Sequence, residues 1–530
     1  MKNSPRKKGL RCWCLRVLAG AAVLMVAGLL YWRSLQPKRV YREHTSTVSR
    51  EFEYLARRTD LDSAGNMWLS RKEAEQDLDE LEWLLENRYS YLKLKGVDYK
   101  VALDSIRGSL SDGISRSDFG YQLTKFIALF GDGHSRVASS TVRLVSLCSD
   151  FLPFLVEESD ERLVAFEPDR SGFVDPDFPF LRAMDGLPVS KWLEGANQWV
   201  ARGSPQYLRY HTMRNLRYVE CIRKELGLSR SGSIEVQLES ADGSSTKWME
   251  LTLAKEGPAY GLWPRPENEI KSLDDVRVES RILEENIGYL RIVVMLDGPE
   301  FLEGLLDAMT NFRGTKGLII DARSCGGGSR ATLRVLFPFF MAENDLPRLV
   351  NVAAYRLGTR NRKAEFGGRY LYPASWPNWS DAERAVISSF AGTFRPEWMP
   401  PAGQFSPWHY FLISPTDDER YYHYDEPVVI LMDRWNFSAC DIFLGAFKGW
   451  KKVTLMGLPS GGGSGCRQDY RLHNSQIRIQ LSSMASFQPN GKLYDGNGIQ
   501  PDIIVEPIPK DFIGETDSVL DAARAVLARL

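Results

Sequence analysis

The sequence predicts a multidomain α/β protein, and three stretches with different hydrophobic patterns carry this prediction. Helical periodicity occupies residues 37–148, short alternating strands occupy residues 149–275, and apolar strands alternate with helices over residues 276–530. At 530 residues, with 43% hydrophobic and 25% charged residues, the chain is long enough for about two to four folded domains.

Residues 1–36 carry the pattern of an export or membrane signal. Basic residues precede the uncharged run Val17–Trp32, which is slightly short for a spanning helix of about 20 residues and long for a signal-peptide core of about 7–15. Because the run ends in Tyr31-Trp32-Arg33 with no small-x-small cleavage site, we favour an uncleaved anchor over a cleaved signal. The charge asymmetry then predicts a cytoplasmic N-terminus, with the remaining chain periplasmic or extracellular.

The net charge and the positions of the cysteines limit the partners and cofactors that the sequence predicts. A formal net charge of −1, with basic residues dispersed beyond the N-terminus, argues against a nucleic-acid partner. The seven cysteines are scattered, and only Cys12 and Cys14 lie close together, so neither a metal site nor a disulfide framework is expected. The sequence leaves undecided whether one disulfide forms among the five later cysteines, which an oxidising compartment would allow. We expect no metal and no organic cofactor.

The helical region ends in a turn that holds a candidate base. Lys72–Tyr89 places leucines at spacings of three and four, and Ser117–Phe130 predicts a second helix capped by Ser117. The turn Gly131-Asp132-Gly133-His134-Ser135 follows, and its small residues leave the imidazole of His134 accessible. A surface or structural role is the alternative for this histidine.

The β-rich region, residues 149–275, contains a strand, a tight turn and a helix entry at Phe180–Val189. This pattern is similar to a PDZ-like module, which binds an extended peptide along a strand edge, although a simple hairpin gives the same pattern. Further on, the aromatic and proline-rich stretch 351–425 predicts an insertion, either a substrate lid or a packed surface element.

The last region, residues 276–530, predicts strands and helices in alternation. The expected strands are Ile287–Val294, Gly317–Asp321, Pro427–Met432 and Lys452–Met456, and the expected helices are Pro299–Phe312, Ser329–Met341 and Ser438–Lys448. The second strand runs into Cys325-Gly326-Gly327-Gly328. Glycines there let backbone N–H groups approach a developing oxyanion. A phosphate-binding loop is the competing interpretation, but the G-x-x-x-x-G-K-[ST] pattern is absent.

Ser438 stands at the junction between the strand Pro427–Met432 and the helix that follows. A serine at such a sharp turn can expose its hydroxyl beside unpaired backbone N–H groups, which suits a nucleophile. The alternative is a helix N-cap, the most frequent role of serine before a helix. Cys440 is rejected as the nucleophile because a buried thiol in the first helical turn is inert.

Five motifs, taken in order, resemble the tail-specific, or C-terminal processing, serine peptidases and their tricorn core protease relatives. The motifs are Gly131-Asp132-Gly133-His134, Gly288-Tyr289-Leu290-Arg291-Ile292, Asp321-Ala322-Arg323-Ser324-Cys325-Gly326-Gly327-Gly328, Phe437-Ser438-Ala439-Cys440-Asp441 and Gly498-Ile499-Gln500-Pro501-Asp502. The resemblance covers roughly residues 70–510. It implies a helical N-terminal region, a PDZ-like module and a catalytic core of the crotonase or Clp-protease type.

The resemblance also implies the rest of the site. One branch of the family uses a lysine base, but Gly463 occupies the lysine's place, so the branch with a histidine base remains. In that branch Asp495 is the acidic residue that orients His134; a turn residue is its alternative role. Relatives commonly carry Glu there, and a serine at the place of Gly133.

The expected function is hydrolysis of peptide bonds in protein tails or unfolded polypeptides outside the cytoplasm. Ser438 would be the nucleophile, His134 the base and Asp495 the orienting carboxylate, with an oxyanion hole from Ala439, Gly326 and Gly327. A catalytically silent peptide-binding scaffold and an esterase with the same triad are the alternatives.

Overall fold

The computed structural model describes residues 67–529, apart from 140–141, 143–146, 267–269, 271–274 and 360–367. These residues all lie within one compact unit of the chain, Glu51–Leu530. The predicted anchor Val17–Trp32 lies outside the described residues. In the part of the chain that is described, no helix is both long and apolar enough to cross a bilayer.

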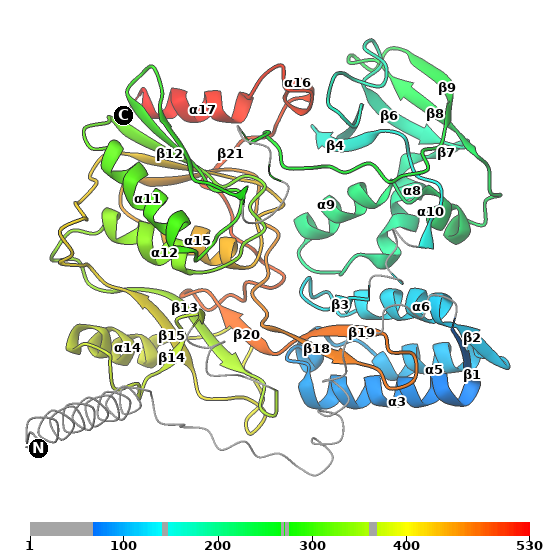
Figure 1. Ribbon diagram of the computed structural model, residues 1–530, viewed down its shortest axis with the longest axis horizontal. Helices are drawn as coiled ribbons and strands as arrows, with labels where there is room; N and C mark the ends of the chain where they lie inside the picture. Colours follow the sequence, from blue (N-terminus) through cyan, green and yellow to red (C-terminus); the bar gives the residue numbers. More distant parts are fainter. Residues whose placement is uncertain are drawn as a thin grey trace, which may run out of the picture. The chain divides into compact units, whose positions relative to one another are not determined.

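A six-stranded sheet forms the centre of the C-terminal region (Figure 1). Its strands, in spatial order, are β10 (Glu279–Ile282), β11 (Ile287–Arg291), β12 (Gly317–Asp321), β16 (Val428–Met432), β17 (Val453–Gly457) and β21 (Ile503–Ile504). Only β10 is antiparallel to its neighbour. Every residue of β11, β12 and β16 is buried, as expected for parallel strands covered on both faces.

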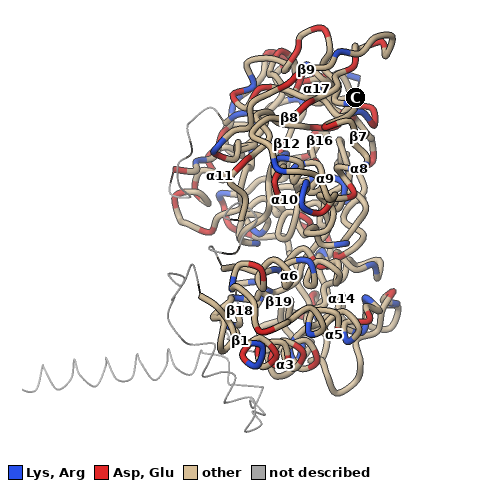
Figure 2. Tube along the Cα trace, turned by 90° about the vertical axis from the view of Figure 1, so that its right-hand side faces the viewer, with Lys and Arg blue, Asp and Glu red and all other residues tan. Residues whose placement is uncertain are grey.

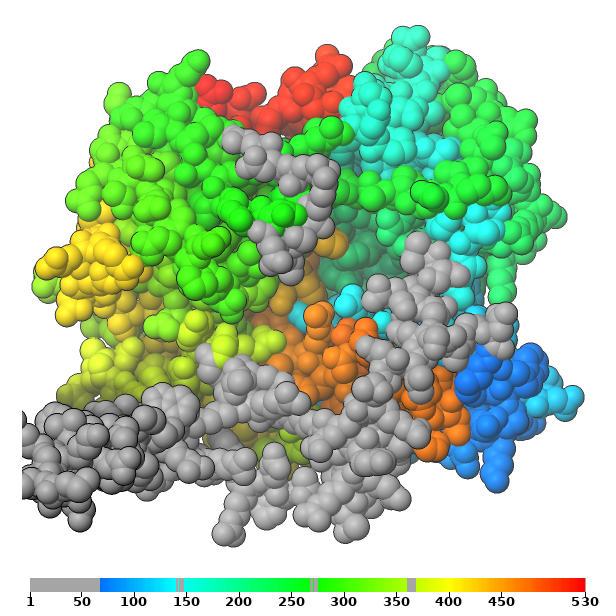
Figure 3. All heavy atoms as spheres, viewed as in Figure 1, coloured from blue at the N-terminus to red at the C-terminus, as the bar shows by residue number. Residues whose placement is uncertain are grey.

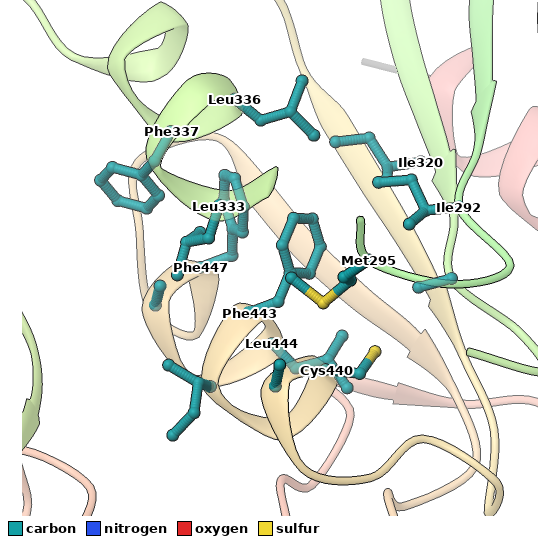
Figure 4. Close-up of a cluster of buried hydrophobic side chains, with 14 of the residues drawn as sticks. Ile292, Met295, Ile320, Leu333, Leu336, Phe337, Cys440, Phe443, Leu444 and Phe447 are labelled. Atoms are coloured by element: carbon teal, nitrogen blue, oxygen red, sulfur yellow. The ribbon is translucent and has the colours of Figure 1, made fainter. Parts of the chain in front are cut away.

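Helices cover the two faces of this sheet. Side chains such as Ile320 and Ile430 pack on one face against α11 (Pro299–Asn311), α12 (Ala331–Leu336) and α15 (Ala439–Phe447). Figure 4 shows part of this core, with Ile320 and Ile292 facing the helices. Ile319 and Leu431, which alternate with these residues along the strands, pack on the other face against α17 (Ser518–Leu527). The sequence therefore predicted this α/β core correctly.

One predicted helix is shorter than expected. The α-helical part of Ser329–Met341 is only α12, and a 3-10 helix, Phe337–Phe340, follows it. Pro338 is the physical reason, since it has no backbone N–H to donate the next α-helical hydrogen bond.

The predicted insertion is a packed part of the structure. A second sheet contains β14 (Tyr372–Pro373), β15 (His409–Ile413), β13 (Arg348–Tyr355) and β20 (Met484–Phe487), with α14 (Asp381–Thr393) beside it. Trp379 is buried, and Trp376, Trp398 and Trp408 pack against the same hydrophobic cluster. The structure thus favours the packed alternative over a lid.

The helical region contains α3 (Arg71–Arg88), α4 (Leu92–Lys95), α5 (Tyr99–Ser109) and α6 (Arg116–Ala128), with the short strands β1 (Trp68–Ser70) and β2 (Gly113–Ser115). The leucines predicted to face the core, Leu78, Leu81, Leu84 and Leu85, are buried. The second helix begins earlier than predicted, because Ser115 rather than Ser117 accepts the capping hydrogen bond from the Asp118 N–H.

The β-rich region forms a sheet of β4 (Leu155–Ser159), β5 (Arg162–Phe166), β6 (Phe180–Met184), β8 (Ser233–Glu239) and β9 (Thr246–Thr252), with β7 (Leu187–Pro188) beside β6. Its helices are α8 (Val189–Ala196), α9 (Pro205–Asn215) and α10 (Val219–Leu226). The strand, turn and helix entry predicted at Phe180–Val189 are confirmed as β6, the Asp185-Gly186 turn, β7 and the start of α8.

A disulfide joins Cys148, which directly precedes this β-rich region, to Cys221 in α10. The bridge closes a loop of 73 residues in sequence. Replacing both cysteines by serine is expected to lower the free energy of unfolding by about 2–5 kcal/mol, because a loop of this length restricts the unfolded chain strongly. Urea unfolding of the parent and the double variant, with and without a reductant, measures this change in the free energy of unfolding. The reductant should destabilise the parent and leave the double variant unchanged; equal stability of both proteins would contradict the assignment.

Candidate active site

Ser438 occupies a strained turn between β16 and α15. Its backbone has φ 61° and ψ −118°, a conformation that a residue with a side chain rarely adopts. The helix begins at the next residue, and the Ser438 side chain makes no capping hydrogen bond. The N-cap alternative therefore fails, and the geometry is that of a nucleophile elbow, which exposes the hydroxyl above the sheet.

Two side chains hold this turn against the glycine loop. Asn436 donates from Nδ2 to the carbonyl oxygens of Ala322 (2.6 Å) and Cys325 (3.2 Å). The carboxylate of Asp433 accepts hydrogen bonds from the backbone N–H groups of Trp435 (3.0 Å) and Ser324 (2.8 Å). Because these bonds join the ends of β12 and β16, the strained backbone of Ser438 cannot relax independently of the glycine loop.

His134 reaches Ser438 from the turn that follows α6. Its Nε2 lies 3.1 Å from the Oγ of Ser438, across 304 positions of sequence. The turn is braced by Asp132, whose carboxylate accepts hydrogen bonds from the His134 N–H (3.0 Å) and from the Ser135 hydroxyl (2.5 Å). The imidazole also stacks on Phe437, with ring centroids 4.5 Å apart. Burial lowers the pKa of His134 below its usual value, which favours the neutral ring that a base requires.

Asp495 lies close to His134 but makes no hydrogen bond to it. Its Oδ2 accepts from the Tyr91 hydroxyl (2.6 Å) and from the Ser464 N–H (3.2 Å). Its Oδ1 and the Nδ1 of His134 are both buried without a hydrogen-bond partner. A carboxylate oxygen of Asp495 and a ring nitrogen of His134 lie within 4.8 Å of each other. The structure thus brings the three predicted residues together, but the hydrogen bond between Asp495 and His134 is not formed.

The same three-residue neighbourhood has the composition of a metal site. Asp132, His134 and Asp495 each place one ligand-type atom within 4.8 Å of the others. Two of these residues already have the roles expected for a base and its orienting carboxylate. Burial, with the charge of Asp132 adding to it, raises the pKa of Asp495. The cluster is therefore explained by proton transfer chemistry, and no step below uses a metal.

Gly327 lies directly against the nucleophile turn. Its φ of +101° belongs to the region that favours glycine, and a Cβ built on it would lie 2.5 Å from the Phe437 carbonyl oxygen and 2.8 Å from the Ala439 nitrogen. Gly326 is one step further away and faces the Trp435 indole, with a built Cβ 3.2 Å from its Nε1. The predicted oxyanion segment and Ala439 are therefore neighbours.

Two further glycines make room for His134 and Phe437. At Gly463, where the lysine of the other branch would stand, a Cβ would lie 2.3 Å from the Phe437 ring and 3.3 Å from the His134 Nδ1. At Gly133 a Cβ would lie 2.7 Å from the Phe437 ring and 2.9 Å from the Tyr207 hydroxyl. The space that a lysine or serine needs is thus filled by the aromatic packing around the imidazole.

Cys440 points away from the site. It is 1% exposed and lies in the core beside Phe443, Leu444 and Met295 (Figure 4). Burial raises its pKa well above the usual value, so the thiol stays protonated. Its rejection as the nucleophile agrees with this environment.

Sequence reasoning missed several residues that hold the site. Asp441 accepts hydrogen bonds from the Ser460 hydroxyl (2.5 Å) and from the Gly463 N–H (3.0 Å), and burial raises its pKa to about 8. Because Asp441 lies three residues after Ser438, its position in the sequence could have indicated a role at the site. Tyr91 donates to Asp495 across 404 positions, and no pattern in the sequence indicates this contact.

Helix α9 of the β-rich region also contacts the site. The Ser204 hydroxyl at its start donates to the Gly461 carbonyl (2.6 Å), and Gln206 donates from Nε2 to the carbonyl oxygens of Ser460 (2.8 Å) and Asn497 (2.9 Å). Tyr207 packs on Phe437 with ring centroids 5.3 Å apart. The loops that flank His134 and Asp495 are therefore joined by a helix from another region.

Comparison with known proteins places this core. Residues 286–505 match the sequence model of Peptidase family S41. A stretch of 91 residues is 30% identical to a carboxy-terminal-processing protease of Bartonella bacilliformis, covering 17% of this chain and 21% of that protein. Another of 84 residues is 36% identical to a tricorn protease homolog of Saccharolobus solfataricus, covering 16% of this chain and 8% of that protein. The matches thus span about a fifth or less of these relatives.

The fold is similar to a solved structure over most of the chain. The crystal structure of mature CPAF aligns with a TM-score of 0.57 at 18% identity, covering 86% of this chain and 96% of that one. At this identity the likeness shows the fold. The sequence match to Peptidase family S41 over residues 286–505 and this likeness in fold are what the comparisons show.

Proposed function

We propose that the protein is a serine endopeptidase that hydrolyses peptide bonds of protein tails or unfolded polypeptides through an acyl-enzyme. One observation carries this proposal: the Nε2 of His134 lies 3.1 Å from the Oγ of Ser438, which stands on a left-handed turn between a strand and a helix. A base in hydrogen-bond contact with the half-buried Ser438 hydroxyl is what a weak nucleophile needs at neutral pH.

The mechanism follows from this geometry. Ser438 Oγ attacks the peptide carbonyl carbon while its proton passes to His134 Nε2, and the backbone N–H groups of Ala439 and the Gly326-Gly327 loop bind the oxyanion. The C–N bond then breaks, and His134 gives the proton to the leaving amine. Water, deprotonated by His134, hydrolyses the resulting ester and restores the Ser438 hydroxyl. Asp495 orients the imidazole once its free oxygen closes on Nδ1.

Four features support the proposed substrate class and the proposed location. The β-rich region has the order of a PDZ-like module, which suits an extended peptide, and one relative is called a carboxy-terminal-processing protease. The Cys148–Cys221 disulfide suits an oxidising compartment. Together with the sequence of residues 1–36, this favours a membrane-anchored protein whose catalytic part lies outside the cytoplasm. Figure 2 shows Lys and Arg interspersed with Asp and Glu along the described trace.

Digestion of casein and of a disordered-tail fusion tests the activity. The parent protein is expected to release fragments, whereas Ser438→Ala should release none above background. A p-nitrophenyl ester assayed in parallel distinguishes a peptidase from an esterase, because an esterase would cleave the ester and not the polypeptides. If the parent protein bound the tail without cleaving it, the result would favour the catalytically silent scaffold over the peptidase.

Replacing Asp495 by asparagine is expected to lower kcat by about 10³- to 10⁴-fold and to move the acid limb of kcat/KM to lower pH. In the parent, protonation of Asp495 removes the orienting charge, and burial raises the pKa at which this happens. Burial lowers the pKa of His134, so the variant should keep a neutral base to more acidic pH. A pH profile of kcat/KM measures both effects.

Tyr91→Phe is the matched control with the opposite sign. The Tyr91 hydroxyl donates to Asp495 and helps to lower its pKa against the effect of burial. Without this hydroxyl the acid limb should move to higher pH. Acid limbs that coincide in the parent and both variants would show that Asp495 does not act on the base.

A further inference from the structure

The cluster of three buried side chains around the catalytic imidazole has the composition of a metal site. Asp132, His134 and Asp495 each bring one ligand-type atom, and these atoms all lie within 4.8 Å of one another. Over the residues that the structure describes, no other three His, Cys, Asp or Glu side chains meet in this way. Their exposed fractions are 0%, 8% and 3%. Since the catalytic mechanism uses no metal, an ion bound here would have another role.

Two atoms of this cluster have no hydrogen-bond partner. The Nδ1 of His134 and the Oδ1 of Asp495 are both buried and unpaired, although buried polar atoms normally have a partner. Gly463 leaves room beside the ring, since a Cβ built on it would lie 3.3 Å from Nδ1. One zinc ion at about 2.0–2.2 Å from each of two atoms bridges a separation of up to about 4 Å. A cation between Nδ1 and Oδ1 would therefore pair both atoms at once.

Hydrogen bonds from neighbouring groups already hold both carboxylates in place. The Oδ2 of Asp495 accepts from the Tyr91 hydroxyl (2.6 Å) and from the Ser464 N–H (3.2 Å). The carboxylate of Asp132 accepts from the His134 N–H (3.0 Å), and each carboxylate oxygen keeps a further lone pair for a cation. Metal ligands in proteins are usually oriented by such outer hydrogen bonds. The cluster thus has the outer partners of a built metal site.

A small sheet joins the two parts of the chain that bring the ligands together. The turn with His134 leads into β3 (Arg136–Val137), which pairs with β19 (Arg478–Ser482) in a sheet completed by β18 (Arg467–Arg471). Figure 3 shows this sheet, orange beside cyan, at the surface of the viewed side. Because β19 precedes the segment that carries Asp495, the pairing restrains the ligands from moving apart.

The donor set favours zinc over magnesium or calcium. One imidazole nitrogen and two carboxylate oxygens suit Zn²⁺, with a water as the fourth ligand, whereas Mg²⁺ and Ca²⁺ take six or more oxygen ligands. Ligand atoms of a tetrahedral zinc ion lie roughly 3.3 Å apart, so atoms within 4.8 Å need to approach by at most about 1.5 Å. The positive charges of Arg369, Arg467 and Arg136 act on the imidazole and oppose a cation. Two carboxylates at ligand distance attract it, and this attraction grows as the distance falls.

A zinc ion on Nδ1 would take the base out of action. A neutral imidazole has one nitrogen with a lone pair and one N–H. Catalysis needs the lone pair on Nε2, which lies 3.1 Å from the Oγ of Ser438. A metal on Nδ1 uses the lone pair there and keeps the single ring proton on Nε2. The Nε2–H then donates to Ser438 and can no longer accept its proton.

We propose that Asp132, His134 and Asp495 bind Zn²⁺ and that this ion reversibly inhibits the enzyme. The inhibition rests on the proposed peptidase function, whereas the zinc site itself does not. Because zinc and catalysis need opposite positions of the one ring proton, the zinc-bound protein is inactive, and removal of the ion restores the base.

Equilibrium dialysis of the metal-free full chain against zinc chloride, followed by metal analysis, tests the site without any catalysis. Ser438→Ala keeps all three ligands and should bind one zinc ion per chain more than His134→Ala. Asp495→Asn should weaken this binding by at least about 10- to 100-fold, the loss typical when only an outer partner of a metal ligand is removed. His423→Ala is the matched control, because this histidine is 41% exposed and lies beside Asp425; its zinc content should equal that of the parent.

Cleavage of a fluorogenic peptide tests the inhibition. Zinc should lower the kcat of the parent, EDTA should restore it, and a large excess of Mg²⁺ should have no effect, because Mg²⁺ prefers oxygen ligands. Tyr91→Phe removes an outer hydrogen bond of Asp495 and should raise the zinc concentration for half inhibition by about 10- to 100-fold. His423→Ala should be inhibited like the parent.

Equal zinc content in Ser438→Ala and His134→Ala would overturn the site, and full activity of the zinc-loaded parent would overturn the inhibition. An unchanged zinc requirement in Tyr91→Phe would also count against this site. All three results leave the peptidase intact as long as the metal-free parent cleaves and Ser438→Ala does not. A metal-free parent without cleavage would instead overturn the proposed function, while the zinc content of Ser438→Ala would still test the site.

Discussion

Replacing His134 by alanine is expected to lower kcat by about 10⁵- to 10⁶-fold, nearly as much as replacing Ser438. The reason is that, among the described residues, His134 is the one base in contact with Ser438, whose Oγ lies 3.1 Å from the imidazole Nε2. Substrate binding should change little, since the imidazole acts on the proton and not on the rest of the peptide. Single-turnover cleavage of a fluorogenic peptide measures the loss.

The double variant His134→Ala with Ser438→Ala sharpens this prediction. Residues that act as one unit give non-additive losses, so the double variant should be no slower than either single variant. His423→Ala is the control, because this side chain is 41% exposed and lies beside Asp425 rather than Ser438. Additive losses, or a His134→Ala variant that retains most of its activity, would assign proton transfer to another group.

Replacing Gly327 by alanine is expected to lower kcat by about 10²- to 10³-fold, the cost of losing one oxyanion donor. The new Cβ would lie 2.5 Å from the Phe437 carbonyl oxygen and 3.0 Å from the Ser438 Cβ. It would also have to adopt a φ of +101°. The loop must therefore move away from Ser438 and Ala439. Steady-state kinetics, with the KM expected to change less than kcat, measures the effect.

Gly172→Ala is the matched control, because a Cβ built there meets nothing within 4 Å. Its activity and its thermal unfolding should equal those of the parent. For Gly327→Ala, circular dichroism should show that the fold is kept. A variant with normal kcat would mean that the glycine loop takes no part in binding the oxyanion.

Much of the core could be predicted from the sequence because its signals are local. The strands at Gly317–Asp321 and Val428–Met432 are continuous apolar runs, which parallel strands covered on both faces require. The turn at Ser438 was also visible, as a serine between an apolar strand and a helix. Its left-handed backbone was not, since the same pattern is compatible with an ordinary N-cap.

The remainder of the site depends on contacts between distant parts of the chain. The brace from Tyr91 to Asp495 spans 404 positions, and Gln206 reaches Ser460 across 254. Neither leaves a periodic or spacing signal in one sequence. The open contact between Asp495 and His134 is of the same kind, because a difference of about 1–2 Å decides a hydrogen bond and follows from packing alone.

Labelling with a fluorophosphonate probe, mapped by mass spectrometry, tests most directly that Ser438 is a hydroxyl activated by His134. We expect one modified residue, Ser438, in the parent and in Cys440→Ala, and labelling slowed by several orders of magnitude in His134→Ala. Modification of a different residue, or equal labelling rates in the parent and His134→Ala, would contradict it.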